Sequence, residues 1–375
     1  MLFYCIFKSN QIPEFMKIPQ KLIQKLNARK EQLSFRFLST QAKGVDFYSN
    51  DYLGIAKLSF KSNLAHGATG SRLISGYSAI SKELELKGAS FFKQPTATLY
   101  NSGYDANIGF FSSVPQRGET VLYDSLCHAS IRDGIKLGFA KSYNFKHNDI
   151  AHLTKRLKRI EGTVYVVVEA VYSMDGDEAL LLEIADVCKE YGALLVVDEA
   201  HSGGIYGNSG EGLISQYGLD NQVFAKIVTF GKAFGSHGAF VLSNQIIKDY
   251  LVNFSRSLIY TTSIPPSCQA HLLFALEHTT KAIEERKKLF ENIAFFKKMA
   301  VEKNLHLLPS NSPIQGVVIP NIVKIREKAE RLENKGFLVK PILSPTVPEG
   351  EERIRICIHS YNTKSEIADL INNWK

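Results

Sequence analysis

Short apolar segments alternate with amphipathic segments between about residue 95 and residue 230. The clearest apolar segment is VYVVVE at 164–169, and its nearly continuous apolar character is typical of a strand buried on both faces. An amphipathic helix is expected at 180–191, and a second apolar strand, ALLVVD, follows at 193–198. Because strands that alternate with helices form parallel sheets with right-handed crossovers, the pattern predicts an α/β domain with a mostly parallel sheet.

A second informative stretch is KIVTFGKAFGSHGAFVL at residues 226–242. It contains two apolar runs, 227–230 and 239–242, which predict short strands joined by a glycine-rich turn that carries Lys232. Glycine and aromatic neighbours favour a poorly solvated lysine. Desolvation lowers the pKa of an amine and makes it a usable nucleophile or Schiff-base partner. An ordinary hairpin whose lysine points to solvent is the alternative interpretation of this stretch alone.

Asp198 ends the apolar strand at 193–198, and His201 follows three residues later. Open α/β sheets bind ligands at the carboxyl ends of their strands. A lysine and an aspartate in one pocket are what pyridoxal phosphate requires, because the lysine holds its aldehyde as an imine and the aspartate keeps the pyridine nitrogen protonated. The two stretches therefore predict pyridoxal phosphate as the cofactor, held between Lys232 and Asp198.

The same motifs, in the same order, occur in a known family. From about Lys17 onward the chain resembles the α-oxoamine synthases, which are fold-type I pyridoxal-phosphate-dependent enzymes. The motifs that carry the resemblance are SNDYLG at 49–54, ISGYS at 74–78, MDGD at 174–177, DEAHSGG at 198–204 and TFGKAFG at 229–235. The resemblance implies an α/β fold-type I transferase with a mostly parallel, seven-stranded sheet in a large domain and a smaller α+β C-terminal domain.

The resemblance also implies a domain organisation and an assembly. We expect an N-terminal extension and helix at 1–43, the large cofactor-binding domain at 44–272 and the small domain at 273–375. Residues 1–15 precede the resemblance and are interpreted as an upstream-start artefact or an extension. IYTTSIPP at 259–266 is similar to a segment by which a partner subunit reaches the active site, so a homodimer with shared active sites is expected.

Four residues receive catalytic roles from the resemblance: Lys232, His128, Asp198 and His201. Lys232 would bind the cofactor and remove the α-proton of the amino acid, while Asp198 would hold the ring nitrogen protonated. His201 would hydrogen-bond the ring hydroxyl, and His128 would cover one face of the ring. The remaining cofactor contacts are expected at Gly103, Tyr104, Ser173 and Thr229.

The phosphate is expected at the start of a helix. Asn101-Ser102-Gly103 follows a strand and precedes a helix, whose N-terminus presents the free N–H groups that bind phosphate. Relatives often carry a small residue where Asp105 stands, and a carboxylate beside a phosphate is unfavourable. Asp105 is therefore expected to cap the helix.

Substrate contacts are expected at Arg36, His128, Thr346 and Arg355. Arg36 would lie on an amphipathic helix at 17–37 and reach the acyl substrate, and a surface arginine is the alternative. Arg355 would clamp the amino-acid carboxylate, because a guanidinium matches a carboxylate bidentately. Many relatives have arginine where Leu343 stands, so recognition of the distal end of the acyl chain is expected to differ here.

The sequences of the segments ISGYS, TSIPP and SPTVP resemble the branch of the family that condenses L-alanine with a pimeloyl thioester on the route to biotin. The other branches, which join glycine to acetyl- or succinyl-coenzyme A or serine to a long acyl thioester, stay open. Coenzyme A and acyl-carrier protein both stay open as carriers of the acyl group. A non-catalytic homologue is disfavoured, because the lysine, the aspartate and both histidines are present.

Composition limits the other classes of function. Basic residues exceed acidic ones by 45 − 37 = 8, which suits nucleic acid, coenzyme A or an acidic carrier protein. The basic residues are spread over amphipathic helices such as 287–303, which disfavours nucleic acid. No apolar run is long enough for a membrane span and no signal peptide is recognisable, so the cytoplasm is expected. Five scattered cysteines without a CxxC pair indicate reduced thiols and no metal site.

Two nucleotide-binding interpretations fail on spacing. DEAH at 198–201 also occurs in helicases, but those require a GxxxxGK[ST] phosphate loop. Here Lys226 stands where the first glycine of that loop would be, and Ala233 follows Lys232. A dinucleotide-binding dehydrogenase would need GxGxxG after an early strand, and that spacing does not occur.

Overall fold

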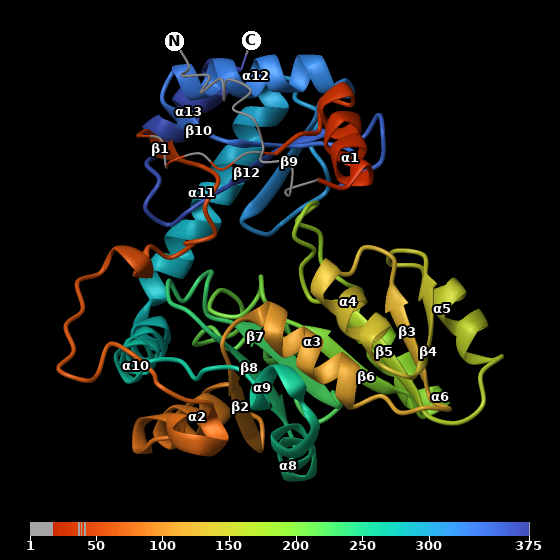
Figure 1. The fold of residues 1–375 in the computed structure, drawn as a ribbon. Helices are drawn as coiled ribbons and strands as arrows, with labels where there is room; N and C mark the ends of the chain where they lie inside the picture. Colours follow the sequence, from red (N-terminus) through yellow and green to blue (C-terminus); the bar gives the residue numbers. More distant parts are fainter. Residues whose placement is uncertain (1–17, 37, 39, 41–42, 375) are drawn as a thin grey trace.

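The computed structural model describes residues 18–374 except 37, 39, 41 and 42. The extension expected at residues 1–15 lies outside the described residues. Figure 1 shows two domains, with a large sheet and its helices below and a smaller domain above. Among the described helices, none combines the length and the apolar character needed to cross a membrane.

The large domain is built on a seven-stranded sheet. Its strands in spatial order are β2 (Thr96–Tyr100), β8 (Ala239–Ser243), β7 (Ala225–Thr229), β6 (Leu194–Asp198), β5 (Val164–Glu169), β3 (Thr120–Asp124) and β4 (Lys141–Phe145). Only β8 runs antiparallel to its two neighbours, β2 and β7, and the other pairs are parallel. The prediction of a mostly parallel, seven-stranded sheet is confirmed.

Helices cover both faces of this sheet (Figure 1). The large-domain helices are α2 (Ala79–Phe91), α3 (Gly103–Ser113), α4 (Ala129–Leu137), α5 (Ile150–Leu157), α6 (Leu181–Tyr191), α7 (Leu213–Gln216), α8 (Gln245–Phe254), α9 (Arg256–Ile259) and α10 (Pro266–Lys281). In β6, Val196 packs on the side of α3, α4, α8 and α9, whereas Leu195 and Val197 pack on the opposite side. Alternating side chains are thus buried on both faces, which explains the unbroken apolar sequence.

The small domain contains residues from both ends of the described chain. Its main sheet is antiparallel, in the order β11 (Lys340–Ile342), β12 (Arg353–Cys357) and β9 (Ile314–Val318). A second sheet pairs β1 (Val45–Asp46) with β10 (Phe337–Leu338). The helices are α11 (Ile283–Glu302), α12 (Ile322–Asn334) and α13 (Lys364–Asn372), and α11 runs from α10 into the upper domain (Figure 1).

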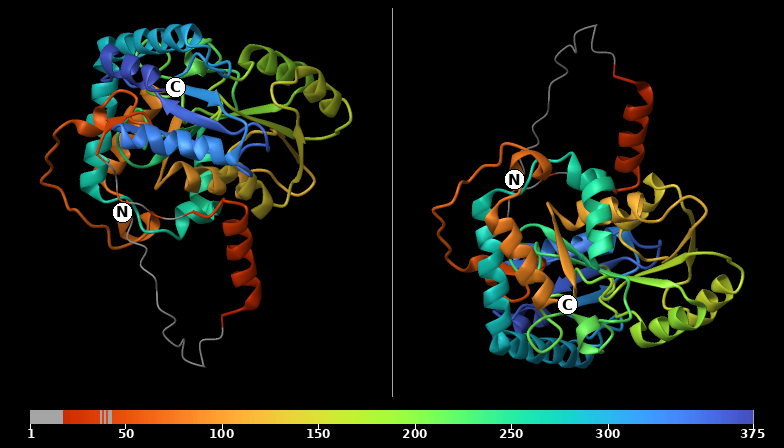
Figure 2. Two further views of the ribbon diagram at one scale, coloured as in Figure 1. Left: turned by 90° about the horizontal axis from the view of Figure 1, so that it is seen from above. Right: turned by 90° about the horizontal axis from the view of Figure 1, so that it is seen from below.

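The N-terminal helix is shorter than predicted. α1 spans Gln20–Glu31, whereas a helix over 17–37 was expected; positions 17 and 37 themselves lie outside the described residues. Leu33 adopts a positive φ of 52°, and the N–H of Ser34 bonds back to the carbonyl of Arg29, so the helix ends there. Figure 2 shows α1 standing away from the rest of the molecule, and none of its residues is buried.

Candidate active site

Four acidic or hydroxyl side chains lie at the carboxyl ends of neighbouring strands. Asp124 ends β3, Glu169 ends β5, Asp198 ends β6 and Thr229 ends β7. Because parallel strands end at one edge of the sheet, these groups share one site. The small domain lies against the same edge, since Arg355 of β12 donates a hydrogen bond to the carbonyl of a residue just after β5, Ser173 (2.7 Å).

Lys232 lies in the turn between β7 and β8 and is partly buried. Its Nζ is 2.7 Å from Nε2 of His201. Burial lowers the pKa of Lys232 to about 8, although the carboxylates of Asp198 and Glu169 act in the opposite direction. Burial, reinforced by the Lys232 charge, also holds the pKa of His201 well below its usual range. A neutral imidazole therefore faces an amine that is partly deprotonated near neutral pH.

The Asp198 carboxylate is held by two donors. Nδ2 of Asn107, on α3, donates to Oδ2 at 2.8 Å, and the backbone N–H of Ala200 donates to Oδ1 at 2.9 Å. Asn107 also donates to Oγ of Ser130 at 3.0 Å, which ties α3 to α4. The carboxylate is thus fixed in orientation. Its remaining lone pairs can accept a hydrogen bond from a donor in the pocket.

The start of α3 forms a cradle beside Thr229. Ser102 caps this helix, and its Oγ accepts from the N–H of Asp105. A Cβ added at Gly103 would lie 3.2 Å from Cβ of Thr229 and 3.4 Å from its Oγ1, so glycine keeps this space open. Asp105 is in the first turn and accepts a hydrogen bond from Ser102, so Ser102 and not Asp105 is the cap. The side chain of Tyr104 is exposed and bonds Asp133 at 2.7 Å.

His128 caps the N-terminus of α4. Its Nδ1 accepts from the N–H of Ser130 at 3.2 Å, and Oγ of Ser130 lies 2.8 Å from the same atom. Partial burial lowers the pKa of His128, with Asp198 acting against the shift. The backbone N–H of His128 donates to Oε1 of Glu169. The ring is therefore tethered at Nδ1 and exposed elsewhere.

The predicted substrate residues form two groups. Arg355 donates to Oδ1 of Asn50 (2.9 Å) and contacts Sγ of Cys357 (3.0 Å), besides its bond to the Ser173 carbonyl. Arg36 lies beyond the end of α1, not on a helix as predicted, and its Nη2 donates to Oγ1 of Thr346 at 3.4 Å. The structure thus brings Arg36 and Thr346 together and sets Ser173 beside Arg355.

Sequence reasoning missed four groups in this site. Glu169 is buried, and burial together with Asp198 raises its pKa to about 8. Oη of Tyr52 lies 2.8 Å from Nδ1 of His201, and Asn50 contacts Arg355. Glu169 ends an apolar strand as Asp198 does, and this shared position in the sequence could have identified Glu169 as a site residue. Asn107 carried no signal, because nothing in a helical sequence distinguishes a buried amide that supports a carboxylate.

These residues suit pyridoxal phosphate. A helix N-terminus with a glycine cradle suits a phosphate, a partly deprotonated lysine suits an aldehyde, and an oriented carboxylate suits a protonated ring nitrogen.

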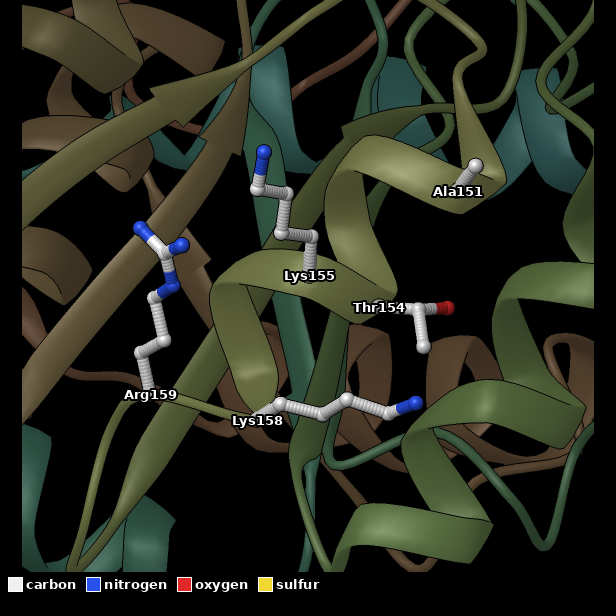
Figure 3. Close-up of a pocket in the computed structure, with 5 residues that line it drawn as sticks. All are labelled: Ala151, Thr154, Lys155, Lys158 and Arg159. Atoms are coloured by element: carbon white, nitrogen blue, oxygen red, sulfur yellow. The ribbon is translucent and has the colours of Figure 1, made fainter.

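Figure 3 shows a different pocket, which has a volume of 510 Å³ and is lined by Ala151, Thr154, Lys155, Lys158 and Arg159. None of the predicted site residues lines that cavity.

Comparison with known proteins decides the family. The sequence profile described as aminotransferase class I and II matches residues 42–373. A protein from Emericella nidulans named 8-amino-7-oxononanoate synthase is 36% identical over 385 residues, covering 93% of each chain. One of the same name from Marinobacter nauticus is 37% identical over 336 residues, covering 87% of this chain and 85% of the relative. The chain belongs to the 8-amino-7-oxononanoate synthase family.

Solved structures are consistent with this assignment. An 8-amino-7-oxononanoate synthase from Francisella tularensis matches with a TM-score of 0.76 and 28% identity, over 88% of this chain and 96% of that one. The serine palmitoyltransferase of Sphingomonas wittichii matches with a TM-score of 0.89 and 26% identity, over 96% and 97%. As a member of the 8-amino-7-oxononanoate synthase family, the chain is a fold-type I transferase that depends on pyridoxal phosphate. The predicted fold class, enzyme class and cofactor are confirmed.

The lowered pKa of Lys232, the residue expected to bind the aldehyde, predicts that cofactor binding depends on pH. Only the neutral amine attacks an aldehyde, and the pKa of Lys232 is about 8. The rate at which the cofactor-free protein combines with pyridoxal phosphate should rise about tenfold per pH unit below pH 8 and level off above it. Stopped-flow absorbance between pH 6 and about 9.5 measures this rate, and a plateau that begins only near the usual pKa of a lysine, about 10.4, would contradict the expectation.

Proposed function

We propose that this enzyme condenses L-alanine with a pimeloyl thioester to form 8-amino-7-oxononanoate in biotin biosynthesis. A carbon–carbon bond forms between the α-carbon of alanine and the thioester carbonyl, the thiol leaves, and the alanine carboxylate leaves as CO₂. What supports the reaction class is the Lys232 amine, with its pKa of about 8, beside His201 in the pocket of Asp198. What supports the substrate pair is the name shared by relatives that match nearly the whole chain.

Pyridoxal phosphate, when bound, supplies an aldehyde that combines with amines and a protonated ring that accepts electrons. Asp198, oriented by its hydrogen bond from Asn107, would hold the proton at the ring nitrogen. Lys232 would hold the aldehyde of the cofactor, and its free amine would accept the α-proton at Nζ. Its depressed pKa lets the amine alternate between these two protonation states near neutral pH.

The neighbouring side chains set the orientation of the reacting groups. His201 is buried between Lys232 and Tyr52, and its lowered pKa keeps it neutral, so it would hydrogen-bond the ring hydroxyl of the cofactor. His128 would cover one face of the ring, and its position is set by the bond from its backbone N–H to Glu169. The start of α3 at Gly103 and Tyr104, together with Thr229, binds the phosphate through backbone N–H groups and a hydroxyl.

The amino-acid carboxylate binds at Arg355. This guanidinium is buried, and it faces the acceptor Oδ1 of Asn50 and the carbonyl of Ser173, which fix its plane. A fixed guanidinium with remaining N–H groups favours a planar anion.

Arg36 and Thr346 are proposed to contact the acyl group. Replacing Arg36 with alanine is expected to raise the KM for the pimeloyl thioester about tenfold, because a hydrogen bond from a charged donor is lost, while the KM for alanine stays unchanged. Steady-state kinetics with each substrate varied in turn measures the two constants. Lys25→Ala, an exposed cation on α1, is the matched control. An unchanged KM for the thioester in Arg36→Ala would assign this arginine to the surface.

A substrate panel tests the proposed function. The purified enzyme is assayed with alanine, glycine or serine against pimeloyl, acetyl, succinyl and palmitoyl thioesters, with CO₂ and thiol release followed together. Turnover only with alanine and the pimeloyl thioester is expected. The serine palmitoyltransferase structures make serine with the long-chain donor the second candidate. Turnover with glycine or serine alone would overturn the proposal, and parallel assays with coenzyme A and carrier-protein donors identify the carrier.

A homodimer is proposed on the strength of an exposed apolar patch. Leu73 and Ile74 are 58% and 85% exposed, and their segment is joined to the 259–266 segment by a bridge between Ser71 and Thr262. Thr261 and Thr262 of that segment would approach the cofactor phosphate of the partner subunit.

The four described free cysteines suit a reducing compartment, and we therefore propose that the enzyme is cytoplasmic.

Charging the patch should disrupt the dimer. Ile74→Glu is expected to weaken self-association by at least about 30-fold, because a buried interface anchor is worth roughly 2 kcal/mol or more. Light scattering over a dilution series measures the dissociation constant. Val301→Glu, at an exposed valine on α11, is the control. Equal dimerisation by both variants would exclude this patch from the interface.

A further inference from the structure

The turn that follows β5 is where the two domains meet. From the small domain, Arg355 donates to the carbonyl of Ser173 at 2.7 Å, and Oγ of Ser310 donates to the carbonyl of Gly176 at 2.8 Å. Arg353 forms an ion pair with Asp175. Gly176 has a φ of +79°, and any side chain there would collide with the main-chain oxygen of Ile314. The small domain therefore contacts this turn closely and at several points.

On the large-domain side, the same turn is held by His147, in the loop between β4 and α5. Nε2 of His147 lies 2.7 Å from Oδ2 of Asp177, at the end of the turn. Nδ1 lies 3.0 Å from Oδ1 of Asp124, at the end of β3. Asn148 adds a donor to Asp177 at 3.1 Å, and the ring of Tyr172 packs edge-on against the imidazole at 4.5 Å between centroids.

Two carboxylates on opposite ring nitrogens require that both nitrogens donate, so His147 is an imidazolium. Burial alone would favour the neutral ring, but the hydrogen bonds to Asp124 and Asp177 outweigh it and raise the pKa of His147 to about 10. The other charged groups nearby, Asp175 and its partner Arg353, neutralise each other. His147 is thus a permanent cation between the sheet edge and the turn.

Among the described residues, no backbone–backbone hydrogen bond joins residues 173–177 to the large sheet. The turn closes on itself through a bridge between Val171 and Glu178 and through the bond from the N–H of Gly176 to the carbonyl of Tyr172. These bonds fix its shape. Its position relative to β3 depends on the side-chain bridge from Asp124 through His147 to Asp177. Asn148 supports the same link, because its backbone N–H donates to Asp124 at 3.1 Å and its side chain donates to Asp177.

We infer that His147 is a positioning residue for amino-acid recognition: its bridge between Asp124 and Asp177 fixes the turn whose Ser173 carbonyl orients Arg355. This inference rests on the proposed function, in which Arg355 binds the amino-acid carboxylate. His147 touches no substrate, and it acts through the turn. Its loss should therefore weaken binding of the amino acid without affecting the thioester.

The test compares His147→Asn with the unmodified enzyme. Asparagine cannot bridge two carboxylates, so the KM for alanine, and its dissociation constant from spectral titration, should rise about tenfold. The KM for the thioester and kcat should stay within about twofold. Hydrogen–deuterium exchange should accelerate in residues 172–178 and in β12. His306→Gln, at an exposed histidine of the small domain, should change none of these.

Asp177→Asn is the second variant, because it keeps the acceptor for Nε2 and removes only the charge. It should fold normally and give a smaller rise in the KM for alanine. Unchanged alanine binding and unchanged exchange in both variants, or equal losses for both substrates, would overturn the inference. If the unmodified enzyme bound no amino acid, the proposed function would fail, and the exchange measurement would still decide whether His147 holds the turn.

Discussion

Replacing Lys232 with alanine is expected to lower turnover by at least about 10³-fold, because in the proposed function this side chain supplies both the amine that binds the cofactor and the base that accepts the α-proton. The same replacement should remove the visible absorbance of the lysine-bound cofactor. The fold should be unaffected, since Lys232 lies in a turn and is only partly buried.

Absorbance spectra and single-turnover kinetics of the Lys232→Ala enzyme measure both effects. Lys189→Ala, at an exposed lysine of α6, is the control for loss of a cation, and it should behave like the unmodified enzyme. If Lys232→Ala kept more than a tenth of the activity, the amine would have to come from another residue.

Replacing Asp198 with asparagine should lower kcat about 10³-fold while the protein still binds the cofactor through Lys232. The amide matches the carboxylate in shape but carries no charge to hold a proton at the ring nitrogen. It also disturbs the pairing with Asn107, whose second polar atom, Oδ1, is buried without a partner among the described residues.

Cofactor content and kcat separate these consequences. Asp186→Asn, on the exposed side of α6, is the isosteric control. A loss of cofactor content equal to the loss of kcat would indicate that Asp198 serves binding alone. A kcat within tenfold of the unmodified value would exclude the proton-holding role.

The fold was largely predictable because its core strands have an unambiguous pattern. Val164–Glu169 is the strand expected from its apolar run, and β6 ends at Asp198 as expected. The turn around Lys232 lies between β7 and β8, as the glycines of that stretch indicated. In each case, local sequence and burial in the sheet favour the same conformation.

The errors and omissions concern residues whose roles depend on distant parts of the chain. The apolar spacing of the N-terminal helix continues past Glu31, but no core packs against it, and the backbone turns at Leu33. Asn107 matters only because α3 packs against the sheet and brings this side chain to Asp198, and Asn50 only because β12 approaches it. The periodicity of apolar residues indicates which face of a helix or strand is buried, but it does not indicate which helices and strands pack together.

The pairing of β1 with the C-terminal strands has a consequence for biosynthesis. Phe47 accepts a hydrogen bond from the N–H of Cys357 at 2.8 Å, and Asn50 meets Arg355, so partners some 300 residues apart in the chain must find each other. A ribosome releases the early partner long before the late one. The proposed pocket for the amino acid therefore assembles last, and a nascent chain that stalls or is cut short before β12 contains Lys232 and Asp198 but not Arg355, the residue proposed to bind the amino-acid carboxylate.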